Sequence, residues 1–450
     1  MILNIHPSAA DNFNKKASEL VKLVKEIPVD QPRSISFHSE LQASVSYNNE
    51  NIISVIDVAT TNYRGKVLQR FFKEKEKRFG LEKENYNKIV EIAEALQSLP
   101  ALRTKLSRSF IEKKLFTWIK NKFQDKGFLE TFTEYLKREA ILSIKQKTSW
   151  IPIAFLEVEI PFFISNSQIH PISKNIIGQW EKKCSLIATE DKKNVSKLFE
   201  KIKKDFQGLS AIVTSVEAEP EHAFNYVIEE AQRITSILGV FSRATLIPDI
   251  KCFSRIKGSE YIARSTVFFE LDDNKFEINN SMLDIPTPQY WRLSRRGIDE
   301  IKKMGLDKLS SFLAAESLKD FEQAVLNSIL LYSKSAFTAD PMEKVVHILS
   351  ALESILLRNE NEPIQQNLAE RIAVFSTDEL EDRKSIIKTI KSVYKIRSKY
   401  LHHGFNSSEL NLLFYFMVRV RSFFIKLIKN TDHFNSKEEF IISIDDQKLS

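Results

Sequence analysis

The stretch Glu379–His403 reads ELEDRKSIIKTIKSVYKIRSKYLHH, and Gly404 follows it. Its apolar residues recur three and four positions apart, which is the spacing of an amphipathic helix. Gly404 stands where such a helix would stop. On a wheel with about 100° per residue, one apolar face gathers Ile386, Ile390, Val393, Tyr400 and Leu401. The stretch therefore predicts a long helix that buries one side against other helices.

The same helical spacing extends on both sides of this stretch, from Ser317 to Lys429. Pro341 and Pro363 stand where helices begin. Helices are predicted, besides the one above, at Ser317–Phe337, Pro341–Arg358, Ile364–Phe375 and Ser407–Lys429. We therefore predict an all-α helical bundle over residues 317–432, followed by a short tail over 433–450.

Residues 148–316 mix strand and helix patterns, which predicts an α+β middle domain. The expected elements are strands at Ile151–Ile164 and Leu209–Glu219, a helix at Pro220–Phe241 and a hairpin at Thr266–Asn280. Asp272 and Asp273 fall in the turn of that hairpin. A metal site there is the alternative interpretation, but a tight turn favours Asp and Asn for its own backbone.

Residues 1–147 are predicted to form a mostly helical region that contains one β-hairpin. The hairpin is expected within Ser34–Thr60, with Asn48, Asn49 and Asn51 at its turn. Helices are expected at Lys66–Phe79, Tyr86–Leu99 and Ser109–Phe123. The predicted fold class is therefore mixed and mostly α, with α+β N-terminal and middle regions before the C-terminal bundle.

The overall composition excludes several classes of protein. The net charge of +7 favours polyanionic partners. Cys184 and Cys252 form no paired motif, so we expect no disulfide framework and a reducing, cytoplasmic location. No window of about 18 residues is free of charge and no signal peptide is recognisable, so no membrane is expected. The sequence motifs GxGxxG, HExxH and GxSxG are absent, and we expect neither a metal nor a cofactor.

Lysines follow the opposite face of the helix predicted at Glu379–His403. They fall between about 140° and 220° on the wheel: Lys384, Lys388, Lys391, Lys395 and Lys399. One interpretation is a solvated face. The other is a track for a phosphate backbone.

Arg397 lies near 20° on the wheel, in the middle of the apolar face. A buried guanidinium needs a partner, because an unpaired buried charge is costly. One alternative is an acid such as Glu353 or Glu370. The other is a phosphate in a groove shared with a second subunit, since the planar fork of arginine matches phosphate oxygens.

His402 lies near 160° on the same wheel, away from Arg397. Gly404 indicates that the helix frays or ends here, which would swing His402 round toward Arg397. The structural alternative for His402 and His403 is a favourable interaction with the C-terminal end of the helix dipole.

The residues Arg397 to His402 resemble the Arg-x4-6-His motif of HEPN domains, and IKSVYKIRSKYLHHG is similar to the Apea-like branch. ILSALESILLR and NLAERIAVF, with Glu353 and Arg371, resemble the preceding helices of that branch. The resemblance covers residues 317–429. It departs from the family in one respect, because His403 and not His402 precedes Gly404.

The resemblance implies metal-independent RNA cleavage by a helical bundle that dimerises, often in prokaryotic toxin or antiviral defence. It implies that Arg397 and His402 are catalytic, with His403 as the alternative histidine. Lys388, Lys391, Lys395 and Lys399 would bind RNA, and Tyr394, Ser398 and Glu353 would support the site. The competing interpretation is a non-catalytic HEPN-type interaction or RNA-binding module. The sequence identifies neither a trigger nor a regulatory partner.

Overall fold

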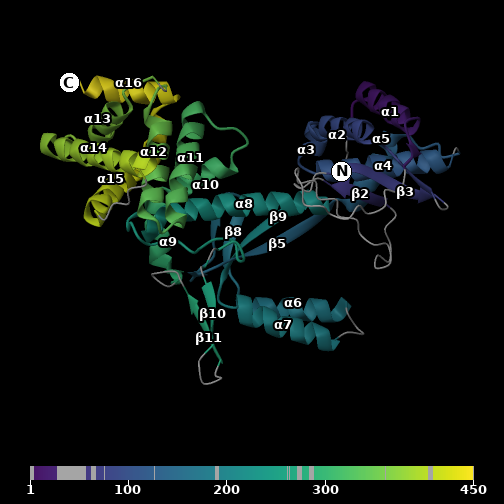
Figure 1. Cartoon of the computed structure of the whole chain (residues 1–450), viewed down its shortest axis with the longest axis horizontal. Helices are drawn as coiled ribbons and strands as arrows, with labels where there is room; N and C mark the ends of the chain where they lie inside the picture. The colour runs from purple at the N-terminus through teal and green to yellow at the C-terminus, as the bar shows by residue number, and fades with distance from the viewer. Residues whose placement is uncertain are drawn as a thin grey trace. The chain divides into compact units, whose positions relative to one another are not determined.

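The chain folds into two compact units (Figure 1). The computed structural model describes residues 5–448 except 28–56, 62–66, 75–76, 126, 188–191, 261, 263, 271–275, 283–287, 360 and 404–408. One unit comprises residues 1–147 and 215–227, and the other comprises 148–214 and 228–450. The predicted fold class is confirmed: the chain is mostly α, with α+β regions before a C-terminal helical part. The predicted domain boundaries stay predictions.

The first unit packs helices against a small antiparallel sheet with the strand order β1-β4-β3-β2. The strands are β1 (Lys25–Glu26), β2 (Asp57–Thr61), β3 (Val67–Glu74) and β4 (Lys77–Gly80). The helices are α1 (Pro7–Val21), α2 (Lys83–Gln97), α3 (Pro100–Arg103), α4 (Arg108–Gln124) and α5 (Phe132–Ser143). The helices predicted at Tyr86–Leu99 and Ser109–Phe123 are confirmed as α2 and α4. The hairpin predicted within Ser34–Thr60 lies mostly outside the described residues.

The helix predicted at Lys66–Phe79 is wrong, because this segment forms β3 and β4. Phe71 and Phe72 are both buried, and Phe72 packs on Phe79 with ring centroids 6.3 Å apart. The spacing of the apolar residues in this segment also fits one face of a helix. The backbone hydrogen bonds are formed instead by antiparallel pairing of β3 with β2 and β4. Gly80 permits this pairing, since a Cβ there would lie 2.3 Å from the Arg70 carbonyl oxygen.

The second unit contains a four-stranded sheet with the order β5-β9-β8-β7. Its elements up to residue 293 are β5 (Lys145–Ile153), β6 (Leu156–Val158), β7 (Phe162–Ile164), β8 (Ser167–Pro171), α6 (Lys174–Ile187), α7 (Lys192–Phe206), β9 (Ser210–Ala218), α8 (Pro220–Phe241), β10 (Arg264–Glu270), β11 (Phe276–Met282) and β12 (Trp291–Leu293). Of these, β5, β9 and α8 also contribute residues to the first unit. Strand β12 pairs with β6 in parallel.

The predictions for this middle region are largely confirmed. β9 and α8 form where expected, and β10 pairs with β11 as the expected hairpin. The segment Ile151–Ile164 is broken into parts of three strands rather than one. Phe155 takes a left-handed backbone conformation with φ 53° between β5 and β6, and Pro161 directly precedes β7. The hairpin turn with Asp272 and Asp273 lies outside the described residues.

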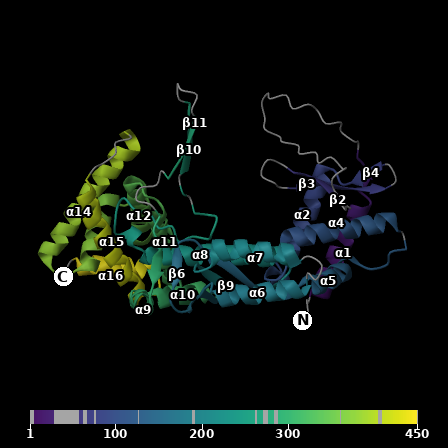
Figure 2. The same cartoon turned by 90° about the horizontal axis from the view of Figure 1, so that it is seen from below.

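The C-terminal part is helical, and the five predicted helices are confirmed as α11 to α15. The helices are α9 (Arg295–Lys303), α10 (Leu306–Ala314), α11 (Asp320–Ser333), α12 (Pro341–Leu356), α13 (Ile364–Ser376), α14 (Leu380–His403), α15 (Leu410–Lys429) and α16 (Lys437–Gln447). Helices α14 and α15 lie side by side (Figures 1 and 2). The predicted tail instead forms α16, which buries Phe440, Ile441 and Ile444. Within the described residues, each helix is too short or too polar to cross a lipid bilayer.

Two buried cations hold the C-terminal end of α8 and the segment after it. Lys344 of α12 is fully buried and donates to the carbonyl oxygens of Ala244, Ile247 and Ile250 at 2.5–3.2 Å. Burial lowers the pKa of Lys344 to about 7, while three carbonyl acceptors match the three N–H donors of its ammonium form.

Arg421 of α15 is the second of these cations. It donates to the carbonyl oxygens of Phe241 and Ser242 and to the Thr245 hydroxyl. Because the carbonyls at a helix C-terminus carry partial negative charge, a cation there is favourable. Arg421 therefore caps the C-terminal end of α8, and Lys344 binds the segment that follows it.

Candidate functional site

Arg397 lies on the buried face of α14, as the wheel predicts. Ile386, Ile390 and Val393 on the same face are buried, whereas the Arg397 side chain is 25% exposed. Its Nη1 lies 3.4 Å from Glu353 Oε1. Of the two acids considered from the sequence, Glu353 is therefore the partner, and Glu370 instead contacts Gln366 and Lys448.

Tyr394 joins Arg397 and Glu353 into one cluster. The Tyr394 hydroxyl donates to Glu353 Oε1 at 2.5 Å, and the Arg397 guanidinium lies 5.8 Å from the centroid of the Tyr394 ring. Burial, together with the Glu353 carboxylate, raises the pKa of Tyr394. Tyr394 therefore stays protonated and acts as a hydrogen-bond donor to the carboxylate that holds Arg397.

The hydrogen-bonding capacity of Arg397 is only partly used. Its Nε is buried, and among the described residues no acceptor lies within hydrogen-bond distance of it. The contact with Glu353 is single and long, whereas guanidinium–carboxylate pairs are frequently bidentate. Arg397 therefore retains donors for a further anion.

His402 is not brought to Arg397 within one chain. Helix α14 ends at His403, directly before Gly404, as the sequence predicts. His402 is still part of the helix, so the expected swing of this residue toward Arg397 does not occur. Five residues at about 100° each place His402 roughly 140° from Arg397 around the axis. The His402 side chain is exposed, as is Ser398, which follows Arg397. The side chain of His403 and the residue Gly404 lie outside the described part.

The lysine face of α14 points to solvent. Lys388, Lys395 and Lys399 are exposed, and Lys391 is partly buried. Lys384 forms a 2.7 Å ion pair with Glu381 at the start of the helix. Between Arg383 and His403 the sequence has no acid, so the exposed face from Lys388 onward is uniformly basic.

Most aromatic residues of α15 are core residues. Phe416, Phe423 and Phe424 are buried, whereas Phe414 and Tyr415 are exposed. Leu401 near the end of α14 and Leu410 at the start of α15 are also exposed. Exposed apolar side chains that a partner subunit could cover therefore include those at the end of α14 and in the first turns of α15.

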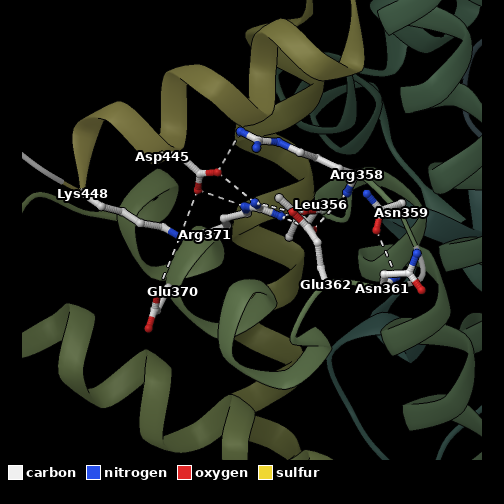
Figure 3. A network of polar contacts seen from close by, with 9 residues as sticks. All are labelled: Leu356, Arg358, Asn359, Asn361, Glu362, Glu370, Arg371, Asp445 and Lys448. Carbon is white, nitrogen blue, oxygen red and sulfur yellow. Dashed lines mark hydrogen bonds and ion pairs between the residues drawn. The ribbon is translucent and has the colours of Figure 1, made fainter.

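A second polar cluster surrounds Arg371 (Figure 3). The sequence analysis names Arg371 but does not predict the other members of this cluster. Arg371 is 3% exposed and donates to Glu362, Asp445 and the Leu356 carbonyl oxygen. These bonds lower the pKa of Glu362 and lower that of Asp445 to about 2. The only sequence signal was Arg371 itself, because Asp445 lies in the segment predicted as a tail.

The described residues contain no cluster of three or more His, Cys, Asp or Glu side chains that could hold a metal ion. Arg397, Tyr394 and Glu353 supply a cation, a hydroxyl and a carboxylate to the cluster at Arg397. In comparisons with known proteins, no family model, curated protein or solved structure matches this chain.

Proposed function

We propose that residues 317–432 form a HEPN-like ribonuclease that cleaves RNA without a metal, as an effector in prokaryotic toxin or antiviral defence. The observation that carries this proposal is Arg397, a partly exposed guanidinium with an unsatisfied Nε on the apolar face of α14. A phosphate oxygen would satisfy donors that Glu353 leaves unused. The resemblance of Arg397–His402 to the HEPN motif supports the same assignment.

The active site in this proposal is shared by two subunits. Because Arg397 and His402 lie about 140° apart on α14, one chain does not direct both at one phosphate. A homodimer through the ends of α14 and α15 would bring Arg397 of one subunit near a histidine of the other. The exposed Leu401, Leu410 and Phe414 would be covered in that dimer.

The proposed chemistry uses groups that this chain and the RNA supply. A neutral histidine takes the proton of the ribose 2′-hydroxyl, and the 2′-oxygen attacks the adjacent phosphorus. The bond from phosphorus to the 5′-oxygen breaks, the protonated histidine returns the proton to that leaving oxygen, and a 2′,3′-cyclic phosphate remains. Arg397 stabilises the charge that builds on the phosphate oxygens. The lysine face of α14 holds the RNA backbone through charge, without reading its sequence.

The test is incubation of the purified full-length protein with total RNA, with and without EDTA. Cleavage is expected in both. Arg397→Ala and His402→Ala should each lower the rate by roughly 10²–10⁴, and His403→Ala should have a mild effect. Arg296→Ala is the matched control, because Arg296 is 90% exposed in α9. Melting curves must show that all variants fold.

A severe loss in His403→Ala with a mild loss in His402→Ala would assign the reaction to His403. If the wild type cleaves no RNA, or only with added Mg²⁺, the nuclease proposal fails. The second candidate, a non-catalytic RNA-binding module, is favoured by the separation of Arg397 from His402 on a regular helix. It predicts RNA binding without cleavage.

A further inference from the structure

A cavity of about 290 Å³ opens between residues 251–260 and the segment before α12. All the residues that line it belong to the second unit. Its lining includes Lys251, Phe253, Arg255, Glu260, Phe337 and Glu343. None of these residues belongs to the Arg397 cluster, so the cavity is a separate feature of the fold.

The two cations that line this cavity, Arg255 and Lys251, each lie close to the ring of a phenylalanine. The Arg255 guanidinium lies 4.0 Å from the centroid of Phe337, and the Lys251 amine lies 4.9 Å from that of Phe253. Among the described residues, no carboxylate lies within ion-pair distance of Arg255, which is half-buried. Burial accordingly lowers the pKa of Arg255. A partly desolvated cation without a counter-charge is costly, and a bound anion would offset that cost.

The acids that line the cavity are bound to other groups. Glu260 pairs with the Lys257 amine at 3.0 Å and accepts a hydrogen bond from the backbone N–H of Gly258. Glu343 accepts from the Thr338 hydroxyl at 2.6 Å. Neither acid neutralises Arg255. The Cys252 thiol also lines the cavity and stays uncharged, because burial raises its pKa.

We propose that this cavity binds a small phosphate-bearing anion, with Arg255 as the main ligand and Lys251 as the second cation. The planar fork of Arg255, whose centre lies 4.0 Å from the centroid of the Phe337 ring, carries paired N–H donors that match phosphate oxygens. Ligand cavities usually span about 300–1,000 Å³, so this one admits inorganic phosphate or a phosphate monoester of about mononucleotide size.

The test is calorimetric titration of the full-length protein with inorganic phosphate, AMP and succinate at constant ionic strength. Phosphate or AMP should bind, and succinate should bind more weakly. Arg255→Gln should weaken phosphate or AMP binding at least tenfold, which is about the loss of one charge-assisted contact. Arg296→Gln is the control for the same change at an exposed arginine and should bind like the wild type.

The unliganded melting temperature separates a ligand role from a structural one. Because Arg255 has no acid partner among the described residues, Arg255→Gln should melt close to the wild type without ligand. If that variant does not fold, Lys251→Gln carries the same titration. The proposal is overturned if the wild type binds neither phosphate nor AMP at millimolar concentration, or if the folded variant binds as tightly as the wild type.

Discussion

At the scale of single residues, Tyr394 and Glu353 determine how Arg397 is presented. The Tyr394 hydroxyl and one Arg397 nitrogen share the same carboxylate oxygen, at 2.5 and 3.4 Å. Glu353 Oε1 therefore accepts its shorter hydrogen bond from Tyr394 and only a longer one from Arg397. A carboxylate already engaged by a neutral donor binds the neighbouring guanidinium less strongly, so the guanidinium stays available to a phosphate.

Tyr394→Phe should destabilise the protein by roughly 1.5–3 kcal/mol, the usual worth of a hydrogen bond to a charged group. The measurement is unfolding in urea, followed by circular dichroism. Tyr415→Phe is the control, since Tyr415 is exposed in the neighbouring helix α15 and should change stability little. Equal effects of the two substitutions would contradict the hydrogen bond as the source of the loss.

The position of Arg397 could be predicted from sequence, but its partner could not. Helical periodicity depends only on the sequence of one segment, so it is enough to place Arg397 on the apolar face of α14. The choice between Glu353 and Glu370 depends on how α12 and α13 pack beside α14, which involves residues far apart in the chain. Periodicity also placed His402 on the other side of α14, and the regular helix agrees with it.

At the scale of elements, the exposed lysine face of α14 is the proposed RNA-binding surface. Changing Lys388, Lys391 and Lys395 together to Gln should weaken RNA binding and reduce its dependence on salt, because each phosphate contact contributes a slope of about −0.7 for single strands. The measurement is RNA affinity at several salt concentrations.

A matched control for this triple variant lies in α7. This helix has three exposed lysines that stand three and four residues apart: Lys197, Lys201 and Lys204. Changing them to Gln removes the same charge as the triple substitution in α14. Their change should leave most of the affinity and of the salt slope intact. Equal losses in both triple variants would show a general effect of net charge and would reject α14 as the RNA-binding face.

Helix α16 is fastened to the bundle by the ion pairs of Arg371 with Glu362 and Asp445 (Figure 3). The pKa of Asp445 is lowered from 3.8 to about 2. Its folded pKa lies below its unfolded one, so its stabilising contribution is present above about pH 4 and is lost as the pH falls toward 2.

Asp445→Asn should remove a contribution of at most about 2 kcal/mol at neutral pH, which corresponds to that pKa shift. The melting temperature of the wild type should then fall more steeply between pH 4 and 2 than that of the variant. Asp446→Asn is the control, because Asp446 is exposed one position further along. Parallel pH profiles for wild type and Asp445→Asn would contradict this account.

At the scale of the whole molecule, the proposed shared active site requires a dimer. The full-length protein should sediment at twice the 52.1 kDa of one chain. Phe414→Glu should shift it to the monomer, since the charge would enter the proposed apolar contact. Phe163→Glu, at an exposed phenylalanine of β7, is the control and should leave the dimer intact. A wild-type monomer at high micromolar concentration would argue against the shared site.

The helical bundle was easier to predict from sequence than the sheets. Helices α11 to α15 follow from local periodicity, because their hydrogen bonds form within each segment. The helix prediction for strands β3 and β4 was wrong although these strands pair with each other, because the spacing of their apolar residues also fits one face of a helix. Helix α16 was missed because its burial depends on Phe321 and Arg371, which precede it by many residues.

The binding of residues 241–250 by Lys344 and Arg421 has a consequence for the order in which a nascent chain can complete its fold. The carbonyl groups near residues 241–250 leave the ribosome first, and their partners lie 94 to 180 residues further along. At about 5–20 residues per second, translation supplies those cations on the order of ten seconds later. Until then only water or a chaperone can donate hydrogen bonds to the carbonyl groups at the end of α8. A chain that is released before residue 421 therefore lacks the arginine that caps this helix.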